Sequence, residues 1–173
     1  VLAARSPVFK AELYGALKER NTYIRIDDMR AEVFRNLLHF AYTDELPPET
    51  IEDGAAMARD LLKAADRYDM ERLKLVCEDR LWSHIDASTA ATTLLLAEQH
   101  RCHRLREACF EFLLTSSTTL NAVMATDGFG HLCKSNPGLL KDILSKLATH
   151  RDRRRRIRQW EEDDNHGFIL RTT

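Results

Sequence analysis

The stretch from Ala56 to Trp82 constrains the fold more than any other part of the chain, because it predicts two helices joined by almost no loop. Its apolar residues recur at spacings of three and four, which places them on one face of each helix. Asp69 is positioned to end the first helix and to cap the second. So short a joint forces the two helices to run antiparallel and in contact. The sequence therefore predicts a helical hairpin in the core of a mainly α-helical protein.

Further helices are expected on both sides of this hairpin. Ser6 and Pro7 mark one start, because serine caps helices and proline fits the first helical position. Phe9, Leu13 and Leu17 would share one face of that helix. The other segments with helical periodicity are a helix capped by Asp28 and closed by Thr43, then 88–99, 103–114, a short helix after the cap cluster Ser116 to Thr119, and Pro137 to His150, where Asn136 caps. Thr22 to Ile26 alternates like a strand, and a strand this short needs a sheet partner.

Composition indicates a globular protein of one domain, with or without an appendage. The chain has 173 residues, of which 44% are hydrophobic, enough for a buried core. Its 26 basic and 27 acidic residues give a net charge of −1, so no overall field favours nucleic acid or an anionic membrane. No apolar run approaches the ~20 residues that cross a bilayer, and no signal-peptide pattern opens the chain. We therefore expect a soluble protein that selects its partners through local surfaces.

The cysteines favour a reducing compartment, and we expect neither a metal nor another cofactor. The four cysteines are Cys77, Cys102, Cys109 and Cys133, and none forms a C-x-x-C pair. Cys102 and His103 are adjacent and point about 100° apart on a helix, while Cys109 lies on an apolar stripe. Elemental analysis is expected to find no stoichiometric zinc, and one zinc per chain, lost with Cys102→Ser, would overturn this. The common motifs of phosphate-binding loops, nucleophile elbows and zinc proteases are also missing from the sequence, so we expect no enzyme.

The composition changes sharply after His150. Residues 151–158 contain six arginines and one aspartate, and Glu161 to Asp164 adds four acids. We expect residues 151–173 to form a charged, disordered tail. Two alternatives are a nuclear import signal and an RNA contact. Binding to RNA phosphates would weaken steeply with salt, whereas a hydrophobic protein interface would not.

Four segments, in order and at matching spacing, resemble the BTB (or POZ) domain of MATH-BTB proteins, the group that includes speckle-type POZ protein. They are VLAARSPVF from Val1, EVFRNLLHFAYTDELP from Glu32, LLKAADRYDMERLKLVCEDRL from Leu61, and the helical continuation from Ile85 to about Leu147. The resemblance implies an α+β BTB/POZ fold over residues 1–84 without its first strands. It also implies a cullin-binding supplement and BACK-like helices over 85–150, followed by the tail.

The resemblance places Val1 in the middle of the family's BTB domain. The Thr22 to Ile26 strand would then lack its sheet neighbours, and an apolar surface would be uncovered. We therefore expect the 173-residue chain alone to aggregate or to stay partly molten. A family-like upstream segment of about 70 residues would restore a cooperative unfolding transition and a dimer, as light scattering and thermal melts would show.

The family's function implies binding without catalysis, in the nucleus, the cytoplasm or both. Its members are substrate-specific adaptors of cullin-3-based E3 ubiquitin ligases and form homodimers or hetero-oligomers with other BTB proteins; the sequence does not name a substrate. Leu17 and Glu19 match the hydrophobic-x-Glu motif at the family's cullin-docking position, although the triplets starting at Val76, Leu96 and Leu105 fit the pattern too. Leu17 could instead simply close the first helix onto the core.

Tyr42 is the second expected cullin contact, because a tyrosine buries a large ring and still presents a hydroxyl. The helix around Ala90 to Leu96 is a third expected contact region. Two alternatives to the adaptor function stay open: a helical scaffold unrelated to ubiquitin, and a truncated competitor that binds cullin without delivering a substrate.

Overall fold

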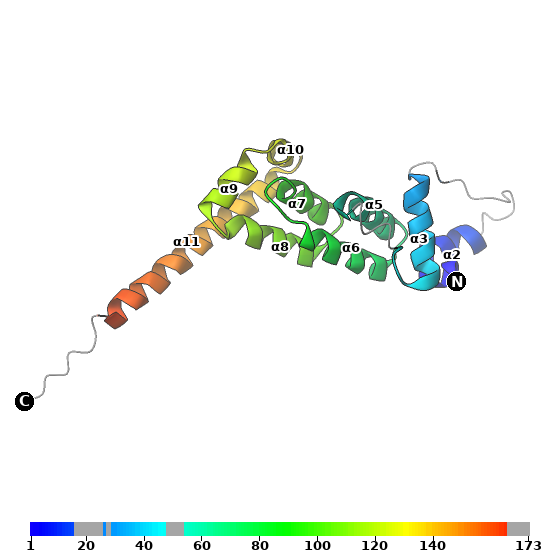
Figure 1. Ribbon diagram of the computed structural model, residues 1–173, viewed down its shortest axis with the longest axis horizontal. Helices are drawn as coiled ribbons and strands as arrows, with labels where there is room; N and C mark the ends of the chain where they lie inside the picture. The colour runs from blue at the N-terminus through cyan, green and yellow to red at the C-terminus, as the bar shows by residue number, and fades with distance from the viewer. Residues whose placement is uncertain (16–25, 27–28, 48–53, 166–173) are drawn as a thin grey trace, which may run out of the picture.

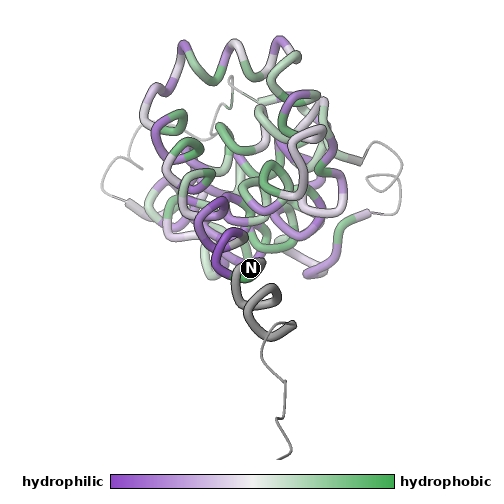
Figure 2. Tube along the Cα trace, turned by 90° about the vertical axis from the view of Figure 1, so that its left-hand side faces the viewer, coloured by the Kyte–Doolittle hydropathy of each residue, from purple (hydrophilic) through white to green (hydrophobic). Residues whose placement is uncertain are grey.

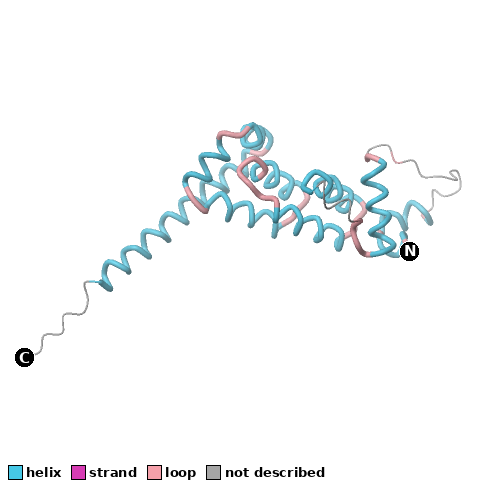
Figure 3. Tube along the Cα trace, in the orientation of Figure 1, coloured by secondary structure: helices cyan, strands magenta, loops and turns pink. Residues whose placement is uncertain are grey.

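The computed structural model describes residues 1–15, 26, 29–47 and 54–165, and every regular element within these ranges is an α-helix (Figure 3). The mainly α-helical fold expected from the sequence is confirmed. Of the strand expected over Thr22 to Ile26, only Ile26 is described, and it belongs to no regular element. The other four positions of that strand lie outside the described residues.

The helices form an elongated body with α1 to α3 at one end and α11 leaving the other (Figure 1). The first five are α1 (Leu2–Arg5), α2 (Pro7–Tyr14), α3 (Ala31–Thr43), α5 (Gly54–Arg67) and α6 (Glu71–Ser83). The following five are α7 (Ala90–Gln99), α8 (His103–Leu114), α9 (Ser117–Met124), α10 (Asp127–Ser135) and α11 (Pro137–Asn165).

Helices α5 and α6 pack against each other as the predicted hairpin. Each helix turns one apolar face inward, and Leu62 and Leu73 have no exposed surface at all. The core around them also takes residues from α2 and α3 and from the facing ends of α7 and α8. Removing this much apolar surface from water is the main force that holds the hairpin together.

The turn between α5 and α6 corrects the expected role of Asp69. Its φ of 51° is left-handed, a conformation that aspartate adopts more readily than most residues. The Met70 N–H donates to the Ala65 carbonyl over 2.8 Å across this turn, as is common where a helix ends in a left-handed residue. Asp69 therefore ends α5 through its backbone, while Met70 takes the N-cap position of α6 without a side-chain cap.

The same joint connects α7 to α8. Arg101 has a φ of 56°, and the Cys102 N–H donates to the Ala97 carbonyl over 2.8 Å. Two consecutive hairpins are thus closed by the same backbone turn, although Asp69 and Arg101 have opposite charges. The turn depends on the left-handed backbone and not on the side chain.

The N-terminal helices are anchored to the end of α5 through Ser6. Its hydroxyl accepts a hydrogen bond from the Phe9 N–H at 3.1 Å and donates to the Tyr68 carbonyl, which confirms it as the cap of α2. The Phe9 ring stacks on the Tyr68 ring with centroids 4.1 Å apart. The cap of α3, in contrast, is Arg30 and not the expected Asp28, which lies outside the described residues.

Helices α7 to α11 bury a second core, which includes Leu94, Phe110, Leu132 and Ile143. Helix α8 has the predicted bounds, and α7 starts at Ala90, two residues later than expected. Helix α10 was not expected, because Gly128 and Gly130 interrupt its apolar pattern. Gly128 lets α10 pack closely on α7, since a Cβ at this position would lie 3.0 Å from the Thr92 methyl group of α7.

Helix α11 differs most from its prediction. It begins as expected, with Pro137 in the first position and the Asn136 side chain accepting from the Leu139 N–H at 3.3 Å. It then continues past His150 to Asn165 and leaves the body as a single helix (Figure 1). Residues 151–165 are therefore helical, and the expected disordered tail does not describe them. Residues 166–173 lie outside the described part.

Candidate protein-binding surface

Tyr42 lies in the last turn of α3 and has 63% of its surface exposed. The helix buries Val33, Leu37, Phe40 and Ala41, and Tyr42 falls off that stripe. A large aromatic side chain held on the outside of a packed helix is the kind of group that anchors protein interfaces. The structure thus places this expected site residue where a partner can reach it.

The end of α3 is fixed by a set of polar contacts around Asp44. Asp44 has a left-handed φ of 65°, and its N–H donates to the Phe40 carbonyl at 2.8 Å. Its carboxylate accepts from Arg5 of α1 at 2.7 Å and from Arg72 of α6 at 2.7 Å. Each exposed pair contributes only about 0–1 kcal/mol. Together they join three helices at one point, so Tyr42 projects from a position that the rest of the fold defines.

Leu17 and Glu19 lie outside the described residues. Helix α2 ends at Tyr14 and Gly15 is extended, so the helix does not reach Leu17 as expected from its apolar stripe. Phe9 is buried and Leu13 is half-buried, as predicted. Whether Leu17 and Glu19 lie on the same surface as Tyr42 therefore stays a prediction.

Most of the third expected contact region is buried. Along α7 the residues Ala90, Ala91, Leu94, Leu95 and Leu96 are all buried. Their side chains fill the cores between the helices and are not accessible to a partner. Five apolar residues in one short helix indicated burial on several faces, which the sequence interpretation did not take into account.

Sequence reasoning missed other exposed apolar groups. Tyr14 is 69% exposed on α2, and on α6 Leu75 and Trp82 are 43% and 51% exposed. Leu75 and Trp82 are seven positions apart, so they share the outer face of α6. Their exposure could have been predicted from the sequence, because neither residue falls on the apolar stripe that α6 buries.

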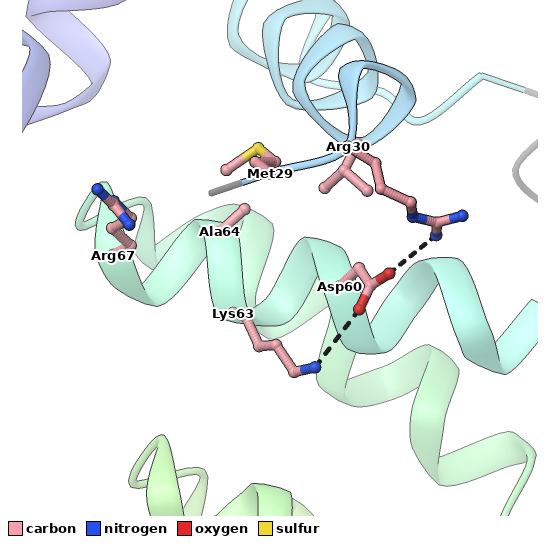
Figure 4. Close-up of a pocket in the computed structure, with 7 residues that line it drawn as sticks. Met29, Arg30, Asp60, Lys63, Ala64 and Arg67 are labelled. Carbon is pink, nitrogen blue, oxygen red and sulfur yellow. Dashed lines mark hydrogen bonds and ion pairs between the residues drawn. The ribbon is translucent and has the colours of Figure 1, made fainter. Parts of the chain in front are cut away.

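A groove of about 510 Å³ lies between the start of α3 and α5. Figure 4 shows its ion pairs: Asp60 accepts from Arg30 at 2.8 Å and from Lys63 at 3.4 Å. Its lining residues are Met29, Arg30, Val33, Asp60, Lys63, Ala64 and Arg67. The lining offers no serine, cysteine or histidine that could serve as a nucleophile or base.

Three of the four cysteines are buried and poorly placed for chemistry. Burial raises the pKa of Cys77, Cys102 and Cys109 to about 12, so their reactive thiolate forms are scarce at neutral pH. Over the part of the chain that the structure describes, no three His, Cys, Asp or Glu residues come together as a metal site. Within the same ranges, no helix is both long enough and apolar enough to cross a membrane.

A polar cluster joins the first hairpin to the end of α7. The Asp66 carboxylate accepts from Lys74 Nζ at 2.6 Å and from His100 Nδ1 at 2.8 Å. Burial acts to raise the pKa of Asp66, but the hydrogen bonds from Lys74 and His100 outweigh it and hold this pKa below its usual value. Burial likewise acts to lower the pKa of Lys74, and the bond to Asp66 outweighs it and raises this pKa.

This cluster predicts a loss of stability in acid. A carboxyl group whose pKa is lower in the folded state stabilises the fold above its unfolded pKa, and this contribution is lost as pH falls through the folded pKa. The difference in melting temperature between the parent chain and Asp66→Asn should therefore shrink from about pH 6 to about pH 3. Asp79→Asn is the control, since Asp79 is 62% exposed. A difference for Asp66→Asn that does not change with pH would contradict the assigned ionic role.

Comparisons with known proteins agree with this architecture. The family model of the BTB/POZ domain matches residues 1–85, and the model described as BPM/SPOP, BACK domain matches residues 89–144.

Three curated relatives illustrate the similarity. BTB/POZ and MATH domain-containing protein 3 of Arabidopsis thaliana is 43% identical over 156 residues, which cover 86% of this chain and 38% of that protein. Protein 4 of the same name and plant is 35% identical over 159 residues, covering 86% and 34%. TD and POZ domain-containing protein 4 of Mus musculus is 35% identical over 150 residues, covering 86% and 39%. The chain thus spans less than two fifths of the length of these relatives.

The chain consists of paired helical modules with exposed aromatic groups on their outer faces. With the two family models together spanning most of its length, the chain belongs to the BTB/POZ family and carries a BACK domain of the BPM/SPOP type.

Proposed function

We propose that this chain is the cullin-binding part of a substrate-specific adaptor of a cullin-3-based E3 ubiquitin ligase. BTB domains generally bind cullins and form dimers, and the family membership supports both roles here. The observation that carries the proposal is Tyr42, an aromatic side chain 63% exposed at the fixed end of α3. Leu17 and Glu19, at the family's docking motif, complete the proposed contact.

The physical basis is the burial of a few apolar groups. Covering the Tyr42 ring would supply affinity, and its hydroxyl would orient the contact. Arg5 and Arg72 both pair with Asp44, two residues after Tyr42, and the three groups together carry one positive charge, which would favour a partner with acidic groups. Leu17 would fill an apolar groove of the cullin, and the Glu19 carboxylate would accept hydrogen bonds.

We propose that the chain acts by binding and not by catalysis. The raised pKa of the buried thiols of Cys77, Cys102 and Cys109 supports this view. We further propose cullin-3 and other BTB chains as partners, and action in the nucleus, the cytoplasm or both. No cofactor is required for this role.

Competition with an intact BTB adaptor tests the proposal. The chain is added to a preformed complex of cullin-3 with such an adaptor, and displaced adaptor is measured by pulldown. We expect displacement that rises with the concentration of the chain and that persists at raised salt, because the contact is largely apolar. A chain that leaves the complex intact at saturating concentration would argue for a scaffold without a ubiquitin role.

A further inference from the structure

The groove between the start of α3 and α5 is lined by an excess of positive charge. Arg30, Lys63 and Arg67 line it together with one carboxylate, that of Asp60, so cations outnumber acids in the lining by three to one. Its volume of about 510 Å³ lies within the usual range of ligand pockets, ~300–1,000 Å³. The charge of the lining therefore favours an anionic occupant.

Asp60 takes up only part of the hydrogen-bonding capacity of the cations beside it. Arg30 donates to Asp60 through Nη2 at 2.8 Å, and a guanidinium carries several further N–H donors. Lys63 Nζ lies 3.4 Å from the other carboxylate oxygen, which is longer than a good hydrogen bond of ~2.7–3.2 Å. The side chains of Arg30 and Lys63 are both more than half exposed. They can therefore donate to an anion that enters from solvent.

Apolar groups lie between two basic ends of the groove. Figure 4 shows Arg67 at one end and Asp60 with its two cations at the other, and Met29 above Ala64 between them. Met29 is half-buried and Ala64 is buried, so they form an apolar floor. The guanidinium of Arg67 lies over the Tyr68 ring, 5.8 Å from its centroid, which favours one position for this cation.

The distance between the two basic ends fits a short extended peptide. Asp60 and Arg67 are seven residues apart on α5, which at ~1.5 Å per residue is about 10 Å along the helix. An extended peptide covers this distance in about three residues, at ~3.3 Å each. Two acidic side chains about three positions apart would therefore reach both ends, and an apolar side chain between them would cover the floor.

We propose that the groove between α3 and α5 binds an extended acidic peptide of another protein, with carboxylates at its two basic ends and an apolar side chain on the floor between them. This site is separate from the surface proposed for cullin, because Tyr42 lies in the last turn of α3 and the groove lies at its first turn. A nucleic acid is a less suitable occupant, since it offers phosphates but no apolar side chain for the floor.

A pair of synthetic peptides tests the site. The first is a blocked pentapeptide with two glutamates on each side of one leucine, and the second has glutamine in place of every glutamate. Binding to the full 173-residue chain is measured by fluorescence anisotropy at about 0.05 M salt. We expect saturable binding of the acidic peptide, at least about 10-fold tighter than that of the glutamine peptide and weakened by salt.

Reversing the charge of the groove tests its residues. In the double variant Lys63→Glu with Arg67→Glu, binding of the acidic peptide should weaken by about 10-fold or more. The same variant should gain binding to a peptide with lysine in place of every glutamate, because its groove is then acidic. A gain of binding is a result that misfolding could not produce.

The matched control is Arg153→Glu with Arg155→Glu, which changes the net charge by the same amount. Both arginines are exposed on α11, which leaves the body at the end opposite to α3 (Figure 1). Figure 2 looks along the molecule from that end and shows hydrophilic turns on the emerging helix. The control should bind the acidic peptide like the parent chain, because its changed charges lie far from the groove.

Both double variants should bind cullin-3 like the parent chain, which separates this proposal from the proposed function. Equal or absent binding of the acidic and glutamine peptides would overturn the proposal. So would an equal loss in the two double variants, or a parent chain that binds duplex RNA in place of the peptide. Asp27 and Asp28 precede Met29 in the sequence. Peptide binding that appears only after both are changed to Asn would also overturn it, since acids of the chain itself would then compete for the groove.

Discussion

Replacing Leu73 with alanine is expected to lower the free energy of unfolding by about 2–5 kcal/mol. Leu73 has no exposed surface and lies in α6 within the core of the first hairpin. The substitution removes buried apolar atoms and leaves a cavity that a close-packed interior fills only partly. Because small domains are stable by only about 5–15 kcal/mol, this is a large part of the total.

Leu75→Ala is the matched control for this prediction. The same change two positions away affects a side chain that is 43% exposed, so we expect a loss of less than about 1 kcal/mol. Urea unfolding followed by circular dichroism would measure both variants. Equal losses at positions 73 and 75 would mean that the orientation of α6 is wrong.

The second large effect concerns the affinity for cullin-3. Tyr42→Ala and Leu17→Ala are each expected to weaken binding by about 10- to 100-fold, which corresponds to about 1.5–3 kcal/mol for a buried interface anchor. Tyr42→Phe should keep most of the affinity, since it retains the ring and loses only the hydroxyl. The circular dichroism spectrum must match that of the parent chain for either result to count.

Trp82→Ala provides a control for the loss of an exposed aromatic ring. Trp82 is 51% exposed near the far end of α6 from Asp44, and its removal should leave the affinity unchanged. If Trp82→Ala weakens cullin binding as much as Tyr42→Ala, the docking surface lies elsewhere.

Helical periodicity predicted the α5–α6 hairpin and the bounds of α8, because each segment shows one continuous apolar stripe. Periodicity did not predict features that depend on a backbone turn or on packing between helices. Asp69 ends α5 by a left-handed backbone and not by a side-chain cap. Helix α10 packs closely on α7 at Gly128, where a Cβ would lie 3.0 Å from the Thr92 methyl group.

The candidate site was predictable to a different extent at each position. Tyr42 falls off the apolar stripe of α3, so its exposure follows from the sequence. The five apolar residues of α7 indicated burial on several faces, but the resemblance led us to expect a docking region there. The helical state of residues 151–165 was also missed, since charge density was taken as a sign of disorder. That the chain alone is partly molten stays a prediction.

Direct titration of the chain into the amino-terminal region of cullin-3 by calorimetry tests the central claim most directly. We predict saturable binding with one BTB chain per cullin, weakened by about 10- to 100-fold in Tyr42→Ala and unchanged in Trp82→Ala. Absence of binding by a chain with a native helical spectrum, or equal affinity of the parent chain and Tyr42→Ala, would contradict it.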